Sequence, residues 1–377
     1  MKLPKIIIRS GCIIHLLLLV TLLAGGQNRE DSDNRISLLF IGDIMGHDDQ
    51  IISARDTVTQ AYNYDKVFSY IKPAISEADI AFANFEVTLS GRPYSGYPSF
   101  SSPDALAVAC ANAGIDYLVT ANNHAADRDY KGIIRTINKL DSIGIPHTGT
   151  FLNGADREIL TPLMITKGGV SIALLNYTYG INAANVPEPV IVNILDKDLI
   201  TKDVSKAKEK KTDLIVLFLH WGIEYDTVPS EYQTDLVEYF FSIGVDFVIG
   251  SHPHVIQKMV WSKNKDTVKD KIAIYSLGNF VSNQRKPKTD GGSMVRIELV
   301  KSGNSISVSD VKYYLTWVFN PFVNNRKEYF ILPCAEFEER SDFFTNPDDY
   351  IQMKRFISDS RELLNKQNIN INEYLFN

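Results

Sequence analysis

Two of the seven histidines in the sequence stand one residue apart, on either side of a proline, in GSHPH at 250–254. His252 and His254 directly follow an apolar run that predicts the end of a buried strand. Proline restricts the backbone between them, so a tight turn can direct both imidazole rings at one place. Imidazole is the commonest metal ligand among side chains. The motif therefore predicts metal ligation, with incidental loop histidines as the alternative.

Similar donor side chains follow the other apolar runs of the chain. The complete set is Asp43, His47, Glu86, Asn123, His124, His220, His252 and His254. Imidazole, carboxylate and amide groups without a thiolate suit Mn, Zn or Fe rather than copper(I) or an iron–sulfur cluster. The set is too large for one tetrahedral zinc, which takes about four ligands. We therefore predict two divalent metal ions that share a bridging carboxylate, polarise an ester or amide oxygen and activate a water.

Several members of this set have a structural alternative. Asp43 is the strongest candidate for a first ligand, and Glu86 could bridge the two ions or only cap its loop. Asn123 could supply an amide oxygen or cap the helix expected at 129–143. His124 could protonate a leaving group. His220 could be a ligand or a satisfied core histidine, and His47 a ligand or a solvent-facing residue.

Four residues beside these motifs are predicted to line a substrate pocket. They are Asn84, Trp221, Glu224 and Asn279. Trp221 could equally pack in the core, and Asn279 could serve its turn rather than orient a water or substrate.

The elements expected from the sequence explain how these residues could meet. Helical stretches repeatedly end in a small residue and an aspartate before an apolar run, as in CANAGIDYLVT and FFSIGVDFVIG. Gly114 and Gly244 suit the left-handed position that ends a helix. Runs that are apolar on both faces predict buried strands, and their alternation with helices predicts an α/β fold. In such folds functional residues gather past the carboxyl ends of the strands. The predicted strands are 36–41, 80–83, 117–121, 214–219, 247–249 and 272–277.

The C-terminal region carries no motif that indicates chemistry. Residues 311–321 and 328–334 alternate as strands of a half-exposed sheet do. Residues 346–364 predict a helix with Asn346 as its cap and proline at its first position. We expect a main domain over 36–300, with 301–377 as strands and a helix that complete it or are appended to it.

The N-terminus has the order of residues found in a secretory signal. Basic residues precede an apolar run at 12–24, and small residues follow it. We expect a signal peptide over 1–26, cleaved after Gly26, and a polar tether over 27–35. An uncleaved anchor is the alternative. The expected location is outside the cytoplasm, in the periplasm or cell envelope.

Composition limits the classes of function that remain. Apolar residues make up 45% of the 377 residues, which argues against wholesale disorder. The formal net charge of −6 argues against a nucleic-acid partner. Cys110 and Cys334 would remain after signal cleavage, either paired or as buried free thiols.

Taken together, the motifs resemble those of the poly-γ-glutamate capsule-synthesis (CapA-type) family. In chain order they are GDIMGH, NFEVTLSG, TANNHAADRDYKG, HTGT, YTYG, HWGIEY, GSHPHVIQ and YSLGNFVSNQ, and they fall within residues 36–300. That family resembles the calcineurin-like metallophosphoesterases. The resemblance therefore implies an α/β fold of the αββα sandwich type, with two mixed sheets flanked by helices.

The resemblance also implies a role for each matching residue. One metal would be held by Asp43 and His254, the other by Asn123, His220 and His252, with Glu86 bridging and His124 as proton donor. The sequence departs from metallophosphoesterases in two places. Met45 stands where they usually have a histidine, so His47 would have to substitute, and Glu86 stands where they have aspartate.

The function implied is that of an exported metal-dependent hydrolase or transferase in capsule or poly-γ-glutamate synthesis, processing or export. The bond broken could be a γ-glutamyl amide. The expected partners are an anionic polymer such as poly-γ-glutamate or a small-molecule ester, a membrane synthesis or export complex, and no nucleic acid. The alternatives are a calcineurin-like phosphoesterase and a non-catalytic polymer-binding subunit of an envelope complex.

Overall fold

A computed structural model describes residues 35–375, except 184, 187, 264–268, 304 and 324. The expected signal peptide and residues 27–34 of the expected tether lie outside the described residues. Within the described part, no helix combines the length and the apolar character needed to cross a membrane.

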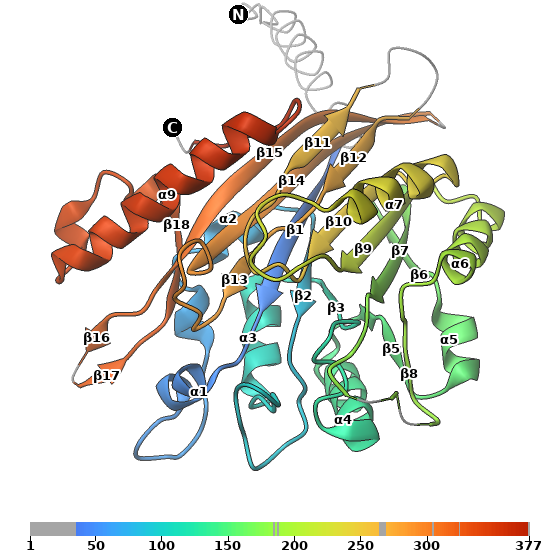
Figure 1. Ribbon diagram of the computed structural model, residues 1–377. Coiled ribbons are helices and arrows are strands. Elements are labelled where there is room, and N and C mark those ends of the chain that lie inside the picture. The colour runs from blue at the N-terminus through green and yellow to red at the C-terminus, as the bar shows by residue number, and fades with distance from the viewer. Residues whose placement is uncertain are drawn as a thin grey trace, which may run out of the picture.

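The larger of two main sheets has nine strands and mixes parallel and antiparallel pairs (Figure 1). The order is β18-β15-β14-β1-β2-β3-β4, with β13 beside β1 and β19 beside β15. β1 to β4 run parallel, whereas β14, β15 and β18 pair antiparallel. The strands are β1 (Arg35–Ile44), β2 (Ile80–Phe85), β3 (Tyr117–Val119), β4 (His147–Thr148), β13 (Asn279–Val281), β14 (Gly291–Ser302), β15 (Ser305–Phe319), β18 (Phe330–Pro333) and β19 (Asn372–Glu373).

The second sheet has six strands in the order β11-β12-β10-β9-β7-β6. Its four inner strands are parallel and its two edge strands antiparallel. They are β6 (Leu163–Lys167), β7 (Val170–Thr178), β9 (Leu214–His220), β10 (Phe247–Ser251), β11 (Met259–Ser262) and β12 (Lys271–Ile274). Two short ribbons pair β5 (Thr150–Phe151) with β8 (Ile191–Val192), and β16 (Phe322–Val323) with β17 (Arg326–Lys327).

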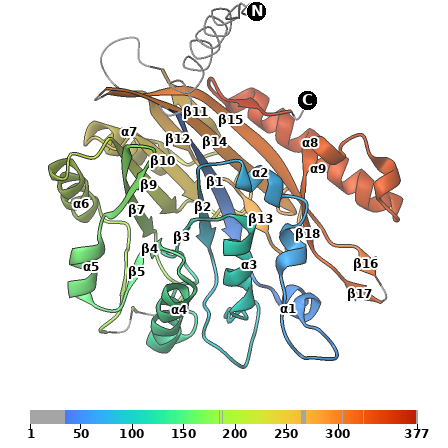
Figure 2. The ribbon, with the colours of Figure 1, turned by 180° about the vertical axis from the view of Figure 1, so that it is seen from behind.

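The two sheets pack face to face around one apolar core. Phe40 and Phe82 of the first sheet meet Val216 and Ile249 of the second in this core. Helices α2 and α3 cover the outer face of the first sheet (Figure 2), and α6 and α7 that of the second (Figure 1). The predicted αββα sandwich of two mixed sheets is therefore confirmed.

The described residues form nine α-helices, labelled α, and two short 3₁₀ helices, labelled η. They are α1 (Asp48–Ala54), η1 (Asp65–Phe68), α2 (Lys72–Ser76), α3 (Ala105–Ala113), α4 (Asp129–Ile143), α5 (Gly154–Leu160), α6 (Lys197–Glu209), α7 (Glu231–Ser242), α8 (Cys334–Phe337), η2 (Ser341–Phe343) and α9 (Pro347–Gln367). α3 ends at Gly114, whose φ of 99° is the left-handed conformation expected there. α9 begins as predicted, because the Asn346 side chain accepts the N–H of Asp348.

The aspartate that precedes each of the strands β2, β3, β9 and β10 has a clear structural task. Its carboxylate accepts a backbone N–H from the start of the neighbouring strand. The four contacts, at 2.8–2.9 Å, are Asp79 with Ser37, Asp116 with Ala81, Asp213 with Ser171 and Asp246 with Ile215. These bonds fix the stagger of β1–β2–β3 and of β7–β9–β10 at their amino ends. The register at the carboxyl ends follows from that stagger.

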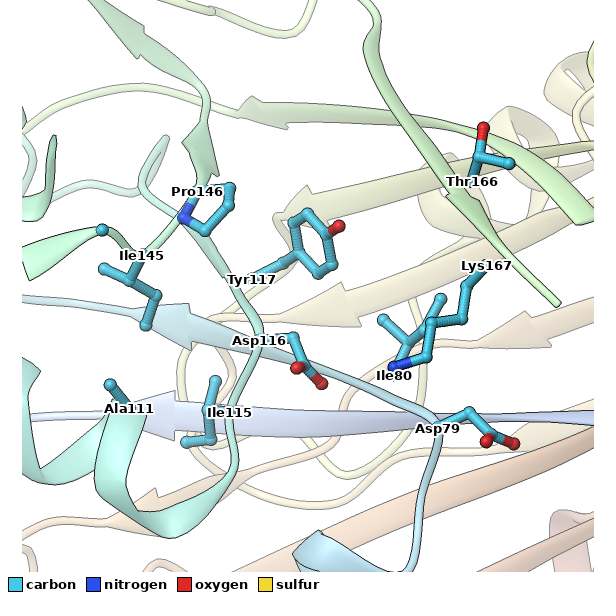
Figure 3. A pocket seen from close by; sticks show the side chains of 11 residues that line it. Asp79, Ile80, Ala111, Ile115, Asp116, Tyr117, Ile145, Pro146, Thr166 and Lys167 are labelled. Carbon is cyan, nitrogen blue, oxygen red and sulfur yellow. The ribbon is translucent and has the colours of Figure 1, made fainter.

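A pocket of about 290 Å³ opens at these amino ends (Figure 3). Asp79 and Asp116 lie in its wall with Tyr117 and Lys167. Both carboxylates already accept strand amides. The acidic side chains of this pocket are therefore already engaged in anchoring the strands.

The C-terminal strands belong to the larger sheet, since β15 pairs with β14 along its whole length. The prediction of a half-exposed sheet is wrong for β15 beyond residue 312, because both faces are buried. Leu315 and Trp317 pack with Phe356 of α9, while Val318 faces the core on the other side. Cys110 and Cys334 are both buried free thiols.

We expect Asp246→Ala to lower the free energy of unfolding by about 1–3 kcal/mol, because the buried N–H of Ile215 would lose its acceptor. Urea denaturation measures the change. Asp235→Ala, at an exposed position of α7, is the matched control and should stay within about 0.5 kcal/mol of the unsubstituted protein. Equal effects of the two substitutions would show that the strand-leading aspartates do not anchor the sheet.

Candidate metal centre

Strands of the larger sheet bring two carboxylates together at their carboxyl ends. β1 carries Asp43, and β2 carries Asn84 opposite it, two residues before Glu86. All three side chains are fully buried. Asn84 Nδ2 donates to Asp43 Oδ1 at 2.7 Å and lies 3.3 Å from Glu86 Oε2. Asn84, predicted to line a pocket, instead ties the two carboxylates to each other.

The second sheet contributes the imidazoles. His220 ends β9 and pairs in register with Ser251 of β10, whose chain then turns through GSHPH. His252 and His254 both take positive φ values, 101° and 58°. Non-glycine residues rarely adopt this conformation, which costs on the order of 1–3 kcal/mol and persists at functional sites. The turn directs His252 Nδ1 to 3.1 Å from His220 Nε2, and His254 Nδ1 to 3.2 Å from Asp43 Oδ2.

These residues form two groups with the spacing of metal ligands. One contains Glu86, His220 and His252, and the other contains Asp43, Glu86 and His254. Glu86 is common to both. Its Oε1 lies 3.5 Å from His220 Nε2 and 3.9 Å from His254 Nε2.

Glu86 Oε1 is the buried oxygen whose surroundings most clearly favour a bound cation. Among the described residues it has no hydrogen-bond partner. Such an atom costs about 1–3 kcal/mol or more when charged, unless a ligand satisfies it. The donor set around it, two carboxylates and three imidazoles, suits a divalent metal. The residues therefore fit the metals expected from the sequence.

Burial sets the ionisation of this centre. It raises the pKa of Glu86 well above its ordinary value, and the neighbouring Asp43 carboxylate adds to the rise. Burial also lowers the pKa of His220 strongly and that of His252 to about 3. The two imidazoles are thus neutral near pH 7, the form that binds metal. A cation between the carboxylates would remove their repulsion.

The loop after β3 adds Asn123 and His124. Asn123 Oδ1 lies 2.8 Å from His220 Nε2, next to the group that contains His252. The alternative role of Asn123 as a helix cap is wrong, because α4 starts at Asp129 with Arg128 in the cap position. Asn122 holds the loop by donating to the Phe85 carbonyl at 2.9 Å.

His124 is held at the wall of a cavity of about 380 Å³. Its Nδ1 lies 2.8 Å from Asp127 Oδ2, which also accepts the N–H of Phe100. Phe100 packs edge-on against the imidazole at 4.6 Å between ring centroids. The cavity is lined by Tyr97, Pro98, Ser99, Asn123, His124, Ala126, Asp127, Asn182, Ala183 and Glu224. The sequence-based prediction missed Asp127, although its position three residues after His124 was a usable signal.

A family profile described as "Bacterial capsule synthesis protein PGA_cap" matches residues 37–284. The chain belongs to this family. It is 30% identical over 294 residues to "Capsule biosynthesis protein CapA" of Bacillus anthracis, covering 74% of this chain and 67% of that one. It is 27% identical over 285 residues to "PGA biosynthesis protein CapA" of Bacillus subtilis (strain 168), covering 72% and 70%. The resemblance drawn from the motifs is confirmed.

Two solved structures also align with the chain. NAD nucleotidase (NadN) of Haemophilus influenzae aligns with a TM-score of 0.47 and 11% identity, covering 90% of this chain and 64% of that one. The calcineurin-like phosphoesterase YfkN of Bacillus subtilis aligns with a TM-score of 0.45 and 13% identity, covering 87% and 98%.

The remaining predicted residues of this PGA_cap protein lie in different places. His47 is outside both ligand groups, at the start of α1, where its N–H donates to Gln50 Oε1 at 2.9 Å. Trp221 is 1% exposed and donates to the Tyr275 carbonyl at 3.0 Å, a position that favours its core-packing alternative. Glu224 is exposed and lines the cavity. Asn279 is buried beside His254, with Oδ1 at 3.1 Å from Nδ1.

We expect Glu86→Gln to affect the stability of the metal-free protein and that of the metal-loaded protein differently. In chelator the variant should unfold at the same or a higher temperature, because the substitution removes the charge repelled by Asp43. With Mn²⁺ at 100 times its Kd, the unsubstituted protein should gain about 2.7 kcal/mol per ion and the variant much less. Differential scanning calorimetry measures both.

Glu209→Gln, at an exposed position at the end of α6, is the control for this test and should respond to Mn²⁺ as the unsubstituted protein does. An equal gain in the Glu86 variant would argue against any metal contact by this carboxylate.

Proposed function

We propose that this capsule-synthesis protein is a metal-dependent hydrolase or transferase that cleaves an amide of the γ-glutamyl type during capsule or poly-γ-glutamate synthesis, processing or export. The observation that carries the proposal is the unpartnered Glu86 Oε1 between two groups of buried ligands. The cavity beside His124 and Asn123 offers room for a substrate next to those groups.

The residues divide into two metal sites. Asp43 and His254 would hold one divalent ion, and Asn123, His220 and His252 the other, with Glu86 shared between them. Mn, Zn or Fe suits these ligands. When bound, such a pair of ions polarises the carbonyl of a substrate and lowers the pKa of a water. Asn84 keeps the two carboxylates in place by donating to Asp43.

The proton that the leaving nitrogen needs would come from His124. Asp127 Oδ2 would accept a hydrogen bond from Nδ1 of His124 and so orient the ring, and Nε2 would carry the donated proton. Phe100 fixes the ring plane from the side. Asp127 therefore acts on the reaction through His124 as a positioning residue.

The charge of the residues around the cavity limits how an anionic substrate could be bound there. Among the described residues of its lining, Glu224 and Asp127 are the charged ones, and no lysine or arginine is present. Carboxylates of an anionic polymer such as poly-γ-glutamate would have to be bound mainly by the metals. A small-molecule ester is the other substrate class that we retain, and the net charge of −6 disfavours nucleic acid.

We further propose that the protein acts at the cell envelope, with a membrane synthesis or export complex as its partner. The support is the secretory pattern of residues 1–26 and the capsule role in the names of the relatives. The N-terminal residues would either be cleaved or serve as an anchor.

We expect His124→Ala to lower the rate of poly-γ-glutamate shortening by about 10²–10⁴-fold, because the leaving group loses its proton donor. Chain length is followed by size-exclusion chromatography with added Mn²⁺. Metal content should be unchanged in this variant, whereas the double variant His252→Ala, His254→Ala should lose both metal and activity.

An unchanged rate in His124→Ala would contradict the assignment of His124 as the proton donor. Retention of the polymer without any shortening would favour a non-catalytic binding subunit. Turnover of aryl phosphates, but not of the polymer, would favour a phosphoesterase.

A further inference from the structure

We propose that Asn279 is a ligand of the ion held by Asp43 and His254, in the place that the sequence assigned to His47. The inference rests on the proposed function, since it requires an ion at this position. Asn279 comes from β13, far along the chain from Asp43.

The pairing of β13 with β1 puts the Asn279 amide beside Asp43. The strands are parallel, with Asp43 opposite Asn279, and the N–H of Asp43 donates to the Gly278 carbonyl at 3.0 Å. This close approach requires glycine at position 42, where a Cβ would lie 2.1 Å from the Gly278 oxygen. The backbone therefore fixes the distance between the two side chains.

Three donor atoms from these residues are spaced as ligands of a single ion. His254 Nδ1 lies 3.1 Å from Asn279 Oδ1 and 3.2 Å from Asp43 Oδ2. Two ligand atoms bound at about 2.1 Å and at right angles lie about 3.0 Å apart. Both distances match this spacing, so His254 Nδ1 lies relative to each of the two oxygens as one ligand atom of an ion lies relative to another.

The orientation of the amide is also fixed. Asn279 Nδ2 donates to Gln284 Oε1 at 3.0 Å and to the Thr289 carbonyl at 2.8 Å. Both amide hydrogens are thereby used, which leaves the oxygen directed at the ligand group. Asn279 is fully buried, and Thr289 is anchored in turn by its own N–H to the Lys286 carbonyl at 3.0 Å. The oxygen is therefore held in place before any ion arrives.

The residues after Asp43 do not offer a comparable ligand. Met45 is 1% exposed and packs in the core under the outer helices. His47 Nδ1 lies 3.1 Å from Gln50 Oε1 and 3.3 Å from the N–H of Asn283, and its ring packs against Phe100. Its imidazole is thus engaged outside the ligand group.

The test compares Mn²⁺ binding by isothermal titration in the unsubstituted protein, Asn279→Ala, Asn279→Asp and His47→Ala. We expect about two ions in the unsubstituted protein. Asn279→Ala should lose one ion or bind it more than about 100-fold more weakly, since even outer-sphere partners cost about 10–100-fold. Asn279→Asp, which keeps an oxygen ligand, and His47→Ala should both retain two ions. Thermal unfolding in chelator checks that each variant is folded.

A Co²⁺ absorption spectrum distinguishes a ligand from a residue that only orients His254. Loss of a ligand from Asn279→Ala changes the set of atoms bound to Co²⁺ and so changes the intensity and position of the visible bands strongly, whereas loss of an outer contact keeps the same bound atoms and shifts the bands only slightly. Unchanged or only slightly shifted bands, unchanged Mn²⁺ binding in Asn279→Ala, or loss of an ion in His47→Ala would each overturn the inference while the proposed function stands. No Mn²⁺ binding by the unsubstituted protein would overturn the proposed function as well.

Discussion

The burial of two adjacent carboxylates, Asp43 and Glu86, is the constraint on which the rest of this centre depends. Neither is exposed to water, and burial together with the neighbouring Asp43 carboxylate disfavours the charge of Glu86. Asn84 offsets part of the cost with an N–H to Asp43, but Glu86 Oε1 has no partner within the described residues. Neutral imidazoles surround the pair without supplying a counter-charge. A divalent cation would satisfy every one of these groups at once, which is why the metal proposal follows from electrostatics as well as from the types of the donor residues.

The two sheets have complementary tasks in building that centre. Aspartates at the amino ends of the parallel strands bind the N–H groups of neighbouring strands and set the stagger. The same stagger places donor residues level with one another at the opposite ends, as in the pairing of His220 with Ser251. The strained turn at His252 and His254 then directs two rings to different members of the group. The strand-anchoring aspartates thus lie at one edge of the sheets and the donor residues at the other.

Much of the candidate site could be predicted from sequence because the end of a strand can be recognised from a few neighbouring residues. An apolar run followed by a donor residue locates Asp43, Glu86, His220 and His254 without knowledge of the partner strands. Misplaced or unassigned residues were those whose role depends on a contact with a distant segment. Asn84 contacts Asp43 of the neighbouring strand instead of lining a pocket, whereas Asp127 is an exception, since it lies only three residues after His124. For β15, burial on both faces depends on α9, which the local alternation of residues could not reveal.

The sequence by itself determined the αββα class, the family and the chemical types gathered at one edge of the sheets. It did so because hydrophobic periodicity and turn residues act over a few neighbouring positions. Only the tertiary structure decided which donor side chains lie close to one another. His47 and Asn279 show the difference. His47 is near Asp43 in sequence but is held by Gln50, whereas Asn279 lies opposite Asp43 through the pairing of β13 with β1 and contacts His254. Long-range strand pairing fixes such distances, and no local pattern encodes them.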